Sequence, residues 1–388
     1  MLPQPHGGKL VGHIFSDLER QRREDELRDL PQLTPSIDHT YDTEKLAIGA
    51  YSPLDGFVDE ATYRSILERT RLPNGLPWSI PIVLTPTGKS NLATLGKLRP
   101  GEDVALLEPK GQFFALLRVD EIYPFDRKAM AQSVYGTTDA KHPNVADLMV
   151  TGDTAISGRV SLLHRLDSPH RRFELTPTET RDVFRARGWK NVAAYQTRNV
   201  PHLAHEYLQR CTLERDDVDG LLVHPVVGRL KKGDYKPEII VEAYERMIES
   251  TYPADRVLLA SLTITMPYAG PKAALFLAIV RKNYGCGLYI VGRDQAGVGT
   301  FYEPFACQRI FDDFPIDVVP VRYQETFYCS ECAWMATPKT CKHPASSHVD
   351  TSQTRIRRAL AGGEPLPKAI LRPEIVDILT RGDVLLTE

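Results

Sequence analysis

The chain has 388 residues, which is enough for two or three domains that each bury a hydrophobic core. Its formal net charge is −2 and 25% of its residues are charged, a balance that favours neither nucleic acid nor an anionic membrane as a partner. No apolar run approaches the roughly 18 residues that a transmembrane helix needs, and the N-terminus lacks the apolar segment of a signal peptide. We therefore expect a cytoplasmic protein with no membrane partner.

Three units are expected along the chain, at residues 1–168, 169–325 and 326–388. In the first, proline, glycine and other turn signals recur at short intervals, and the apolar runs between them are short and β-like. This pattern predicts a mostly β domain with a helix or two.

The second unit has a different rhythm, in which short apolar runs alternate with helical stretches. This alternation predicts right-handed βαβ units and a parallel sheet. Ligands of such sheets bind beyond the carboxyl ends of the strands, so polar loops that follow strands are the candidate site. Strands are expected at 191–195, 220–224, 257–262, 287–291 and 316–321, and helices at 178–187, 201–211, 237–250 and 271–283.

The loop after the first of these strands is the strongest functional candidate. It contains Gln196, Thr197, Arg198 and Asn199, and a helical apolar pattern begins shortly after it. Asn199 is a good N-cap residue and Pro201 suits a first helical turn, so we expect the helix to start here. A helix N-terminus offers unpaired backbone N–H groups and the positive end of the helix dipole, which together favour an anion.

Two histidines and an arginine strengthen this candidate. His202 and His205 are three residues apart and therefore share one face of the first helical turn. Arg198 supplies a permanent charge on a planar fork that suits oxyanions. The alternative is a polar helix start with incidental histidines. The concentration of these groups directly after a strand favours a phosphate-handling site.

A second candidate loop follows the strand expected at 287–291. Three glycines within eight residues would let the backbone approach a ligand closely. Arg293 and Asp294 add a donor fork and an acceptor at the end of the strand. A glycine-rich loop is a weak signal alone, but this one is expected at the same sheet edge as the histidine loop.

The third unit contains a candidate metal site. Cys329, Cys332 and Cys341 are clustered near histidines, which matches the spacing of zinc ligands and argues against a disulfide scaffold. A redox CxxC pair is the alternative, but it would not need the third cysteine or the histidines. We expect His348 to be the fourth ligand, or else His343, because a loop from Cys341 to His343 is tight.

Both candidate loops resemble signatures of the ATP sulfurylase family. The stretch 196–206 is similar to the family pattern QTRNPxHxAHE, with proline one place late and the histidine spacing intact. The stretch 292–299 is similar to GRDHAGxG, with Gln295 in place of the family histidine. Other segments resemble the family in the same order, so the resemblance spans nearly the full length. These segments are 6–8, 52–57, 134–139, 142–145, 224–234, 266–272 and 351–357.

The resemblance implies a PUA-like N-terminal domain, a Rossmann-like nucleotidylyltransferase domain and a small zinc-containing C-terminal subdomain, without a fused adenylylsulfate kinase. It implies the reaction ATP + sulfate = adenylylsulfate + diphosphate, with Mg²⁺ on the phosphates. The partners would thus be ATP, sulfate, adenylylsulfate and diphosphate, and a homo-oligomer is left open.

The resemblance also implies which residues bind the substrates. Sulfate would bind Gln196 and Arg198, helped by the backbone of Ala296. Gln295 keeps a donor and an acceptor but cannot carry the charge of a histidine. The residues implied to line the nucleotide are Gln196, Thr197, Arg198, Asn199, Gly292, Arg293, Asp294 and Gln295.

The same resemblance implies a catalytic loop of Thr197, Arg198 and Asn199. His202 and His205 would stabilise the transition state around the α- and β-phosphates. Sulfate is a poor nucleophile and diphosphate leaves as an anion, so positioning and electrostatic stabilisation should dominate the catalysis.

Departures from the family pattern leave two other functions open. Gln295, Pro267, Asn144 and Gln353 stand where the family usually has other residues, as a catalytically silent, nucleotide-binding regulatory paralogue would show. An adenylyltransferase for another oxyanion is the third possibility. The intact Gln-Thr-Arg-Asn run and both histidines favour the active enzyme. We expect Asn144 to be structural, on a left-handed turn that asparagine tolerates.

Overall fold

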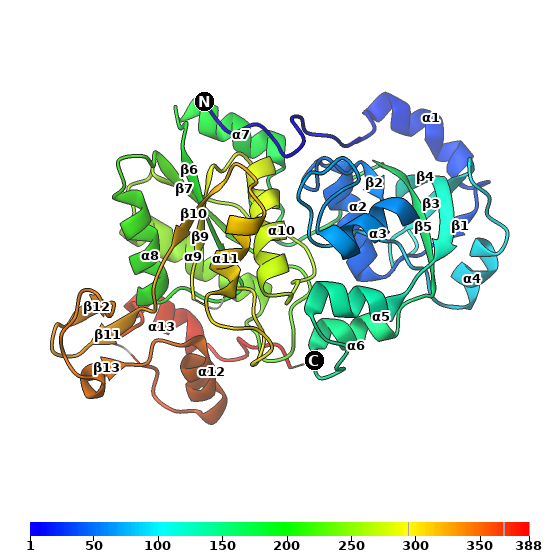
Figure 1. Ribbon diagram of the computed structural model, residues 1–388. Helices are drawn as coiled ribbons and strands as arrows, with labels where there is room; N and C mark the ends of the chain where they lie inside the picture. The colour runs from blue at the N-terminus through cyan, green and yellow to red at the C-terminus, as the bar shows by residue number, and fades with distance from the viewer. Residues whose placement is uncertain (294, 368, 388) are drawn as a thin grey trace.

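The computed structural model describes residues 1–293, 295–367 and 369–387, with only the backbone at positions 24 and 25. Its strands form three sheets, one each in an N-terminal half, a central domain and a small C-terminal subdomain (Figure 1). In the part of the chain described, no helix is both long and apolar enough to cross a membrane.

The N-terminal half is built on a five-stranded sheet in the order β1-β3-β4-β5-β2. The centre of β4 is buried on both faces, because the main core covers one face and Leu27 of α1 packs with Leu116 on the other. Burial on both faces explains the continuous apolar run in this strand. The elements are α1 (Asp17–Leu27), β1 (Gln32–Leu33), α2 (Ile37–Ala47), β2 (Gly56–Phe57), α3 (Glu60–Arg69), α4 (Lys89–Leu95), β3 (Asp103–Leu107), β4 (Phe113–Pro124), α5 (Arg127–Met130), a π-turn (Ala131–Tyr135), α6 (Pro143–Met149) and β5 (Thr154–Leu162).

The central domain confirms the expected parallel sheet, with the strand order β10-β9-β6-β7-β8 and every pairing parallel. All residues of β6, β7 and β9 are buried, as expected for strands covered by helices on both faces. Two strands are shorter than predicted: β8 ends at Leu259 and β10 begins at Val319. The elements are a 3₁₀ turn (Arg171–Phe173), α7 (Pro177–Ala186), β6 (Val192–Thr197), α8 (Leu203–Leu213), β7 (Gly220–Pro225), α9 (Pro237–Thr251), β8 (Val257–Leu259), α10 (Pro271–Asn283), β9 (Leu288–Val291), α11 (Ala306–Asp313) and β10 (Val319–Arg322).

Helix α10 joins the two large parts of the molecule. Its residues from position 273 onward are all buried, because it lies between the central sheet and the N-terminal half (Figure 1). Phe276 packs against Tyr51 and Trp78, with ring centroids 5.2 and 5.7 Å apart. The apolar sequence around this helix thus reflects burial on two sides.

The first residues of the chain also connect the two parts. The N-terminus lies beside α7 of the central domain before the chain crosses to the N-terminal half (Figure 1). Arg181 Nη1 of α7 donates to the backbone oxygen of Pro3 at 2.9 Å. The backbone N–H of His6 donates to Asn283 Oδ1 at 2.8 Å, and its ring Nε2 contacts the oxygen of Pro77 at 2.8 Å. Residues 1–6, which we call the N-terminal strap, therefore contact both parts of the molecule.

The C-terminal subdomain begins with a three-stranded antiparallel sheet in the order β12-β11-β13. It contacts α8 through β12, next to the carboxyl edge of the central sheet (Figure 1). The chain then returns to the central domain, where α13 packs against α9. The elements are β11 (Phe327–Cys329), β12 (Trp334–Ala336), a 3₁₀ turn (Ala345–Ser347), β13 (His348–Val349), α12 (Gln353–Gly362) and α13 (Pro373–Leu379).

Candidate active site

The loop after β6 is held by its own polar groups. Gln196 and Thr197 are the last two residues of the strand and are both buried. Thr197 Oγ1 accepts a hydrogen bond from the backbone N–H of Asn199 at 3.0 Å. This local turn directs the chain from the sheet edge toward α8.

The start of α8 differs from the prediction. His202 is the N-cap, and its Nδ1 accepts a hydrogen bond from the backbone N–H of Ala204 at 3.1 Å. The expectation of Asn199 as N-cap is wrong, because its side-chain oxygen accepts a hydrogen bond from Arg357 instead. Pro201 accordingly lies before the helix and not in its first turn.

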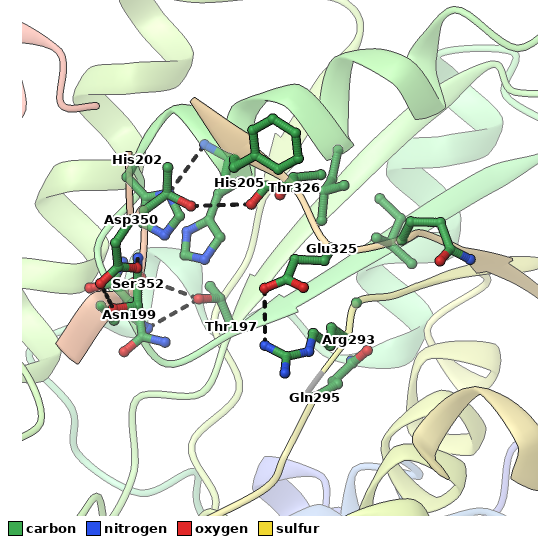
Figure 2. Close-up of a pocket in the computed structure, with 18 of the residues that line it drawn as sticks. Thr197, Asn199, His202, His205, Arg293, Gln295, Glu325, Thr326, Asp350 and Ser352 are labelled. Atoms are coloured by element: carbon green, nitrogen blue, oxygen red, sulfur yellow. Dashed lines mark hydrogen bonds and ion pairs between the residues drawn. The ribbon is translucent and has the colours of Figure 1, made fainter. Parts of the chain in front are cut away.

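A cavity of about 880 Å³ opens at the carboxyl edge of the central sheet. Its walls are the loop after β6 with the start of α8, the loop after β9, and the segment that leads from β10 into the C-terminal subdomain. Figure 2 shows the histidines of α8 facing the segment around Thr326 and Asp350. The predicted catalytic and substrate-binding residues among its lining are Gln196, Thr197, Arg198, Asn199, His202, His205, Gly292, Arg293, Gln295 and Ala296.

His202 and His205 form a stacked pair whose ring centroids are 3.8 Å apart, with 25° between the planes. Burial lowers the pKa of His202 well below its usual range, and the neighbouring His205 lowers it further. Burial also lowers the pKa of His205 to about 4. Both rings are therefore neutral at pH 7. Since Nδ1 of His202 accepts the capping hydrogen bond, its ring proton is on Nε2, which is thus a donor.

Arg198, on the same loop, is held by contacts with neighbouring side chains. Its side chain is 17% exposed, and Nη1 lies 3.3 Å from Asp234 Oδ1. The guanidinium stands 5.0 Å from the ring centroid of Tyr268, a cation–π contact. These contacts place a permanent positive charge in the cavity wall.

Gln295 links the two loops. Its Nε2 donates to Gln196 Oε1 at 3.2 Å and to the Tyr289 hydroxyl at 2.6 Å. Its own Oε1 is buried and has no hydrogen-bond partner among the described residues. A buried acceptor without a partner is costly, so this oxygen is suited to accept a hydrogen bond from a ligand.

Other residues of the loop after β9 contribute an unusual backbone conformation and an exposed ion pair. Ala296 has a left-handed backbone with φ of 56° although it is not glycine. Arg293 forms an ion pair with Glu325 at 3.2 Å across the mouth of the cavity (Figure 2). Gly292 lines the cavity beside them. Asp294, which was expected to contact nucleotide, lies outside the described residues.

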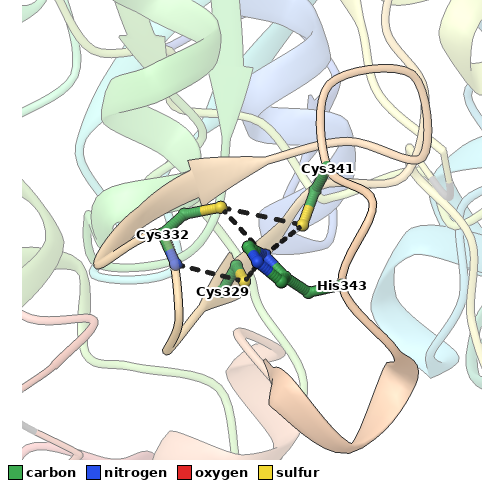
Figure 3. A group of neighbouring side chains, drawn as sticks. All are labelled: Cys329, Cys332, Cys341 and His343. Atoms are coloured by element: carbon green, nitrogen blue, oxygen red, sulfur yellow. Dashed lines mark hydrogen bonds between the residues drawn. The ribbon is translucent and has the colours of Figure 1, made fainter.

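The three predicted cysteines meet in one cluster with a histidine (Figure 3). The Sγ atoms of Cys332 and Cys341 are 3.8 Å apart. Nδ1 of His343 lies 3.4 Å from Cys329 Sγ, 3.3 Å from Cys332 Sγ and 3.5 Å from Cys341 Sγ. The four ligand atoms all lie within 4.8 Å of one another, so the cluster could hold a metal ion.

The fourth member is His343, so the preference for His348 is wrong. His348 lies in β13 directly opposite Cys329 of β11, and its ring stacks on Phe327 with centroids 3.6 Å apart. Its Nε2 contacts the backbone oxygen of His343 at 3.1 Å. The strand pairing turns this ring toward the cavity, whereas the short Cys341–His343 turn folds inward.

Besides Gln295, two of the substituted positions have identifiable contacts. Asn144 is in helix α6 and not on the expected left-handed turn. Its side chain accepts from the backbone N–H of Tyr268 at 2.8 Å and donates to the oxygen of Met266 at 3.3 Å, so it braces the 266–272 loop. Gln353 Nε2 donates to the oxygen of Val200 at 2.8 Å.

Sequence reasoning missed Asp234, Tyr289 and the contact that Arg357 makes with the loop after β6. The Gly-Asp pair after β7 was a usable signal for Asp234, because it follows the carboxyl end of a strand. Tyr289 gave no such signal, because its sequence context is that of any other buried strand residue.

Comparisons with known proteins agree with this architecture. A family model described as ATP-sulfurylase matches residues 171–382, and one described as PUA-like domain matches residues 3–165. The sulfate adenylyltransferase of Hyperthermus butylicus is 44% identical over 382 residues, covering 98% of this chain and 96% of the relative. That of Symbiobacterium thermophilum is 42% identical over 381 residues, covering 97% and 95%. That of Aeropyrum pernix is 42% identical over 380 residues, covering 98% of both.

A solved structure, the hexameric APS kinase from Thiobacillus denitrificans, is similar with a TM-score of 0.77. It is 26% identical, and the match covers 98% of this chain and 69% of that chain. The PUA-like N-terminal domain and the nucleotidylyltransferase-like parallel sheet are thus confirmed. The chain belongs to the ATP-sulfurylase family.

Proposed function

We propose that the chain is a sulfate adenylyltransferase, which converts ATP and sulfate to adenylylsulfate and diphosphate. The observation that carries the proposal is the meeting of Arg198 with the His202–His205 pair on one cavity at the carboxyl edge of a parallel sheet. Such an edge is where α/β domains bind ligands. The full-length similarity to sulfate adenylyltransferases supports the same activity.

The reaction brings two anions together. An oxygen of sulfate attacks the α-phosphorus of ATP and forms a new P–O bond. The bond from that phosphorus to the oxygen that bridges to the β-phosphate breaks, and diphosphate leaves with the electron pair. No side chain has to form a covalent intermediate, so the site needs to position the anions and stabilise the developing charge.

In the proposed site, sulfate binds between Gln196 and Arg198, with a further donor from the backbone N–H of Ala296. The left-handed conformation of Ala296 supports a functional role. Such a conformation costs an L-residue roughly 1–2 kcal/mol, and strain of this kind is concentrated at functional sites. Gln295 holds the amide of Gln196 toward this pocket.

The histidine pair is proposed to face the α- and β-phosphates. The neutral rings offer Nε2–H of His202 as a donor before substrate binds. Phosphate charge nearby favours the protonated form of a histidine, so ATP would raise the pKa of both rings as it arrives. The pair would then carry its positive charge only in the complex.

The nucleotide is proposed to lie along Thr197, Asn199, Gly292, Arg293, Gln295 and the neighbouring Asp294. The segment from Gln324 to Phe327 lines the same cavity and would close its outer side. Mg²⁺ is proposed to enter as part of the substrate, bound to the phosphates of ATP, where it would neutralise their charge.

We propose that the cysteine cluster holds a structural zinc ion on Cys329, Cys332, Cys341 and His343. Tetrahedral zinc with Zn–S near 2.3 Å and Zn–N near 2.0 Å implies about 3.8 Å between sulfurs and about 3.5 Å from sulfur to nitrogen. The observed separations of 3.8 Å and 3.3 to 3.5 Å fit both values. With four protein ligands the site has no open position, so its role would be to stabilise the subdomain.

Elemental analysis of protein purified without chelators tests the zinc proposal. About one zinc per chain is expected for a four-ligand site of this kind. Cys332→Ser should lower the thermal midpoint more than the turnover of folded protein. Absence of metal, or a midpoint unchanged by Cys332→Ser, would contradict the proposal.

Two broader statements also remain predictions, namely the unit borders at 1–168, 169–325 and 326–388 and a cytoplasmic location. A homo-oligomeric assembly is left open. Size-exclusion chromatography with light scattering of purified protein would determine the assembly.

Assays of purified protein in both directions test the activity. ATP and sulfate should give adenylylsulfate, and adenylylsulfate with diphosphate should give ATP. Nucleotide binding without turnover in either direction would identify the regulatory alternative. Turnover that selenate or molybdate supports much better than sulfate would identify an adenylyltransferase for another oxyanion.

A further inference from the structure

Asp234 stands at the centre of a group of charged side chains beside the cavity. Its carboxylate is fully buried, with 0% exposure. Three cations contact Oδ1, with Nη1 of Arg198 at 3.3 Å, Nη1 of Arg357 at 3.0 Å and Nζ of Lys231 at 3.2 Å. The hydroxyl of Tyr268 donates to Oδ2 at 2.8 Å. We call these five residues the Asp234 cluster.

The cluster carries more positive charge than it needs. Three cations surround one carboxylate, so two positive charges are left over. Unneutralised charge that is partly buried is unfavourable, and an anion bound nearby offsets that cost. Arg198 is the member of the cluster that lines the cavity, so this surplus is presented there.

Helix α12 is tied to the catalytic loop by two side chains. Arg357 donates to Asn199 Oδ1 while it also contacts Asp234. Gln353, one helical turn earlier, donates to the backbone oxygen of Val200. Residues at this spacing share one helix face, so one face of α12 is hydrogen-bonded to the loop at two points.

We propose that Asp234 is a positioning residue for Arg198, and that Arg357 is a positioning residue for Asn199. Neither Asp234 nor Arg357 is among the described residues that line the cavity, so each acts through the residue it holds. The inference rests on the proposed function, because the roles of Arg198 and Asn199 in turnover are themselves proposed. A guanidinium aimed before the substrate arrives needs no reorganisation during the reaction.

The chain offers a matched control for the loss of a buried carboxylate. Glu44 of α2 is 1% exposed and is also surrounded by cations. It contacts Lys45, and it lies 2.6 Å from Arg165 and 3.8 Å from Arg171. It does not line the cavity. Glu44→Gln therefore removes an equivalent charge from another part of the molecule.

Steady-state kinetics should distinguish the loss of the Asp234 carboxylate from the loss of the Glu44 carboxylate. Asp234→Asn should lower kcat/KM for sulfate by about 10- to 100-fold, as small misplacements of catalytic groups do, with KM for ATP within about threefold. Glu44→Gln should lower the thermal midpoint but leave kcat/KM of folded protein within about twofold. Asp234→Glu, which keeps the charge and moves it by one methylene, is the second variant if Asp234→Asn does not fold.

A double-mutant cycle tests whether Asp234 acts through Arg198. The measured quantity is the affinity for adenylylsulfate by titration calorimetry in Asp234→Asn, Arg198→Met and the double variant. Once Arg198 is gone, removing Asp234 should cost less than about a further twofold, because coupled residues are not additive. Losses that simply multiply would overturn the proposal. The same cycle with Arg357→Met and Asn199→Ala tests the second pair.

Crystal structures of the variants test the position of the Arg198 side chain directly, without an activity assay. In Asp234→Asn the Arg198 guanidinium should leave its place over the Tyr268 ring, whereas in Glu44→Gln it should remain there. An Arg198 side chain that keeps its position without Asp234 would overturn the inference. Wild-type protein that makes no adenylylsulfate would instead overturn the proposed function, and the structures would still test the positioning.

Discussion

The two sides of the cavity hold charge in different ways. On the loop after β6, the Arg198 guanidinium carries a permanent positive charge and lies 3.3 Å from Asp234. At the start of α8, the stacked rings of His202 and His205 have pKa values lowered by burial and are neutral. The site thus separates charge that is present before binding from charge that binding would induce. Binding of sulfate would need the charge that is present beforehand. Release of diphosphate would be easier from a site whose charge appears only on binding.

Removing the permanent charge should have the largest effect. Arg198→Ala should reduce kcat by about 100- to 1000-fold, as losing one preorganised donor from a charged transition state typically does. Arg198→Lys keeps the charge but loses the planar fork, so it should restore little. Steady-state kinetics with circular dichroism as a folding check would measure this. Near-wild-type turnover in Arg198→Ala would contradict the proposal that the permanent charge of Arg198 acts in the reaction.

Removing one member of the inducible pair should have a smaller effect. Asparagine is a good N-cap, so His202→Asn keeps the start of α8 and removes only the ring from the cavity. We expect kcat to fall by about 10- to 100-fold, with KM for ATP changed less, if the ring acts in the transition state. Thr176→Asn, at the N-cap of α7, is the matched control for a cap replacement. A silent His202→Asn would mean that the histidine only caps the helix.

The glutamine that bridges the loops should have a modest effect on sulfate. Gln295→Ala frees the side chain of Gln196, and loss of one neutral hydrogen bond corresponds to about a fivefold rise in KM for sulfate. Gln295→Glu should raise KM further, because an ionised carboxylate cannot donate and repels sulfate. The exposed Gln132→Ala serves as the control. An unchanged KM in Gln295→Ala would show that Gln196 needs no support.

The smallest expected effect is on stability and depends on pH. The folded pKa of His205, about 4, lies below its value of about 6.5 in the unfolded chain, so the unfolded chain binds more protons between these values. Stability should therefore be complete above pH 6.5 and fall as pH decreases toward 4. From pH 7 to 5 we expect a loss of roughly 1 kcal/mol that His205→Asn does not show, discounted because the ring faces the cavity. Urea unfolding at both pH values would measure it, and parallel curves would contradict it.

Much of the central domain could be predicted because its signals are local. Buried strands such as β7 appear as apolar runs, and α9 matches its predicted position closely because its periodicity reports which face is buried. Helix α10 also matches its predicted position, although it is buried on two sides. The loops at the strand ends could be identified as the candidate site because parallel strands place their carboxyl ends at one edge.

The errors arose where distant contacts override local preference. Asn199 has a good cap propensity, but Arg357, far along the chain, takes its side-chain oxygen, so His202 caps α8 instead. Similarly, His348 has comfortable ligand spacing, but strand pairing turns it onto Phe327 and leaves His343 in the cluster. Asp234 shows the same limit, because nothing near it in sequence predicts contacts with both arginines.

The N-terminal strap has a consequence for dissecting the molecule into fragments. Because Pro3 and His6 are hydrogen-bonded to α7 and α10, a cut between the N-terminal half and the central domain would leave a non-covalent connection in place. The two fragments of a protease-nicked chain should therefore co-purify. Separate expression of residues 169–388 should leave the apolar face of α10 that meets the N-terminal half exposed to solvent.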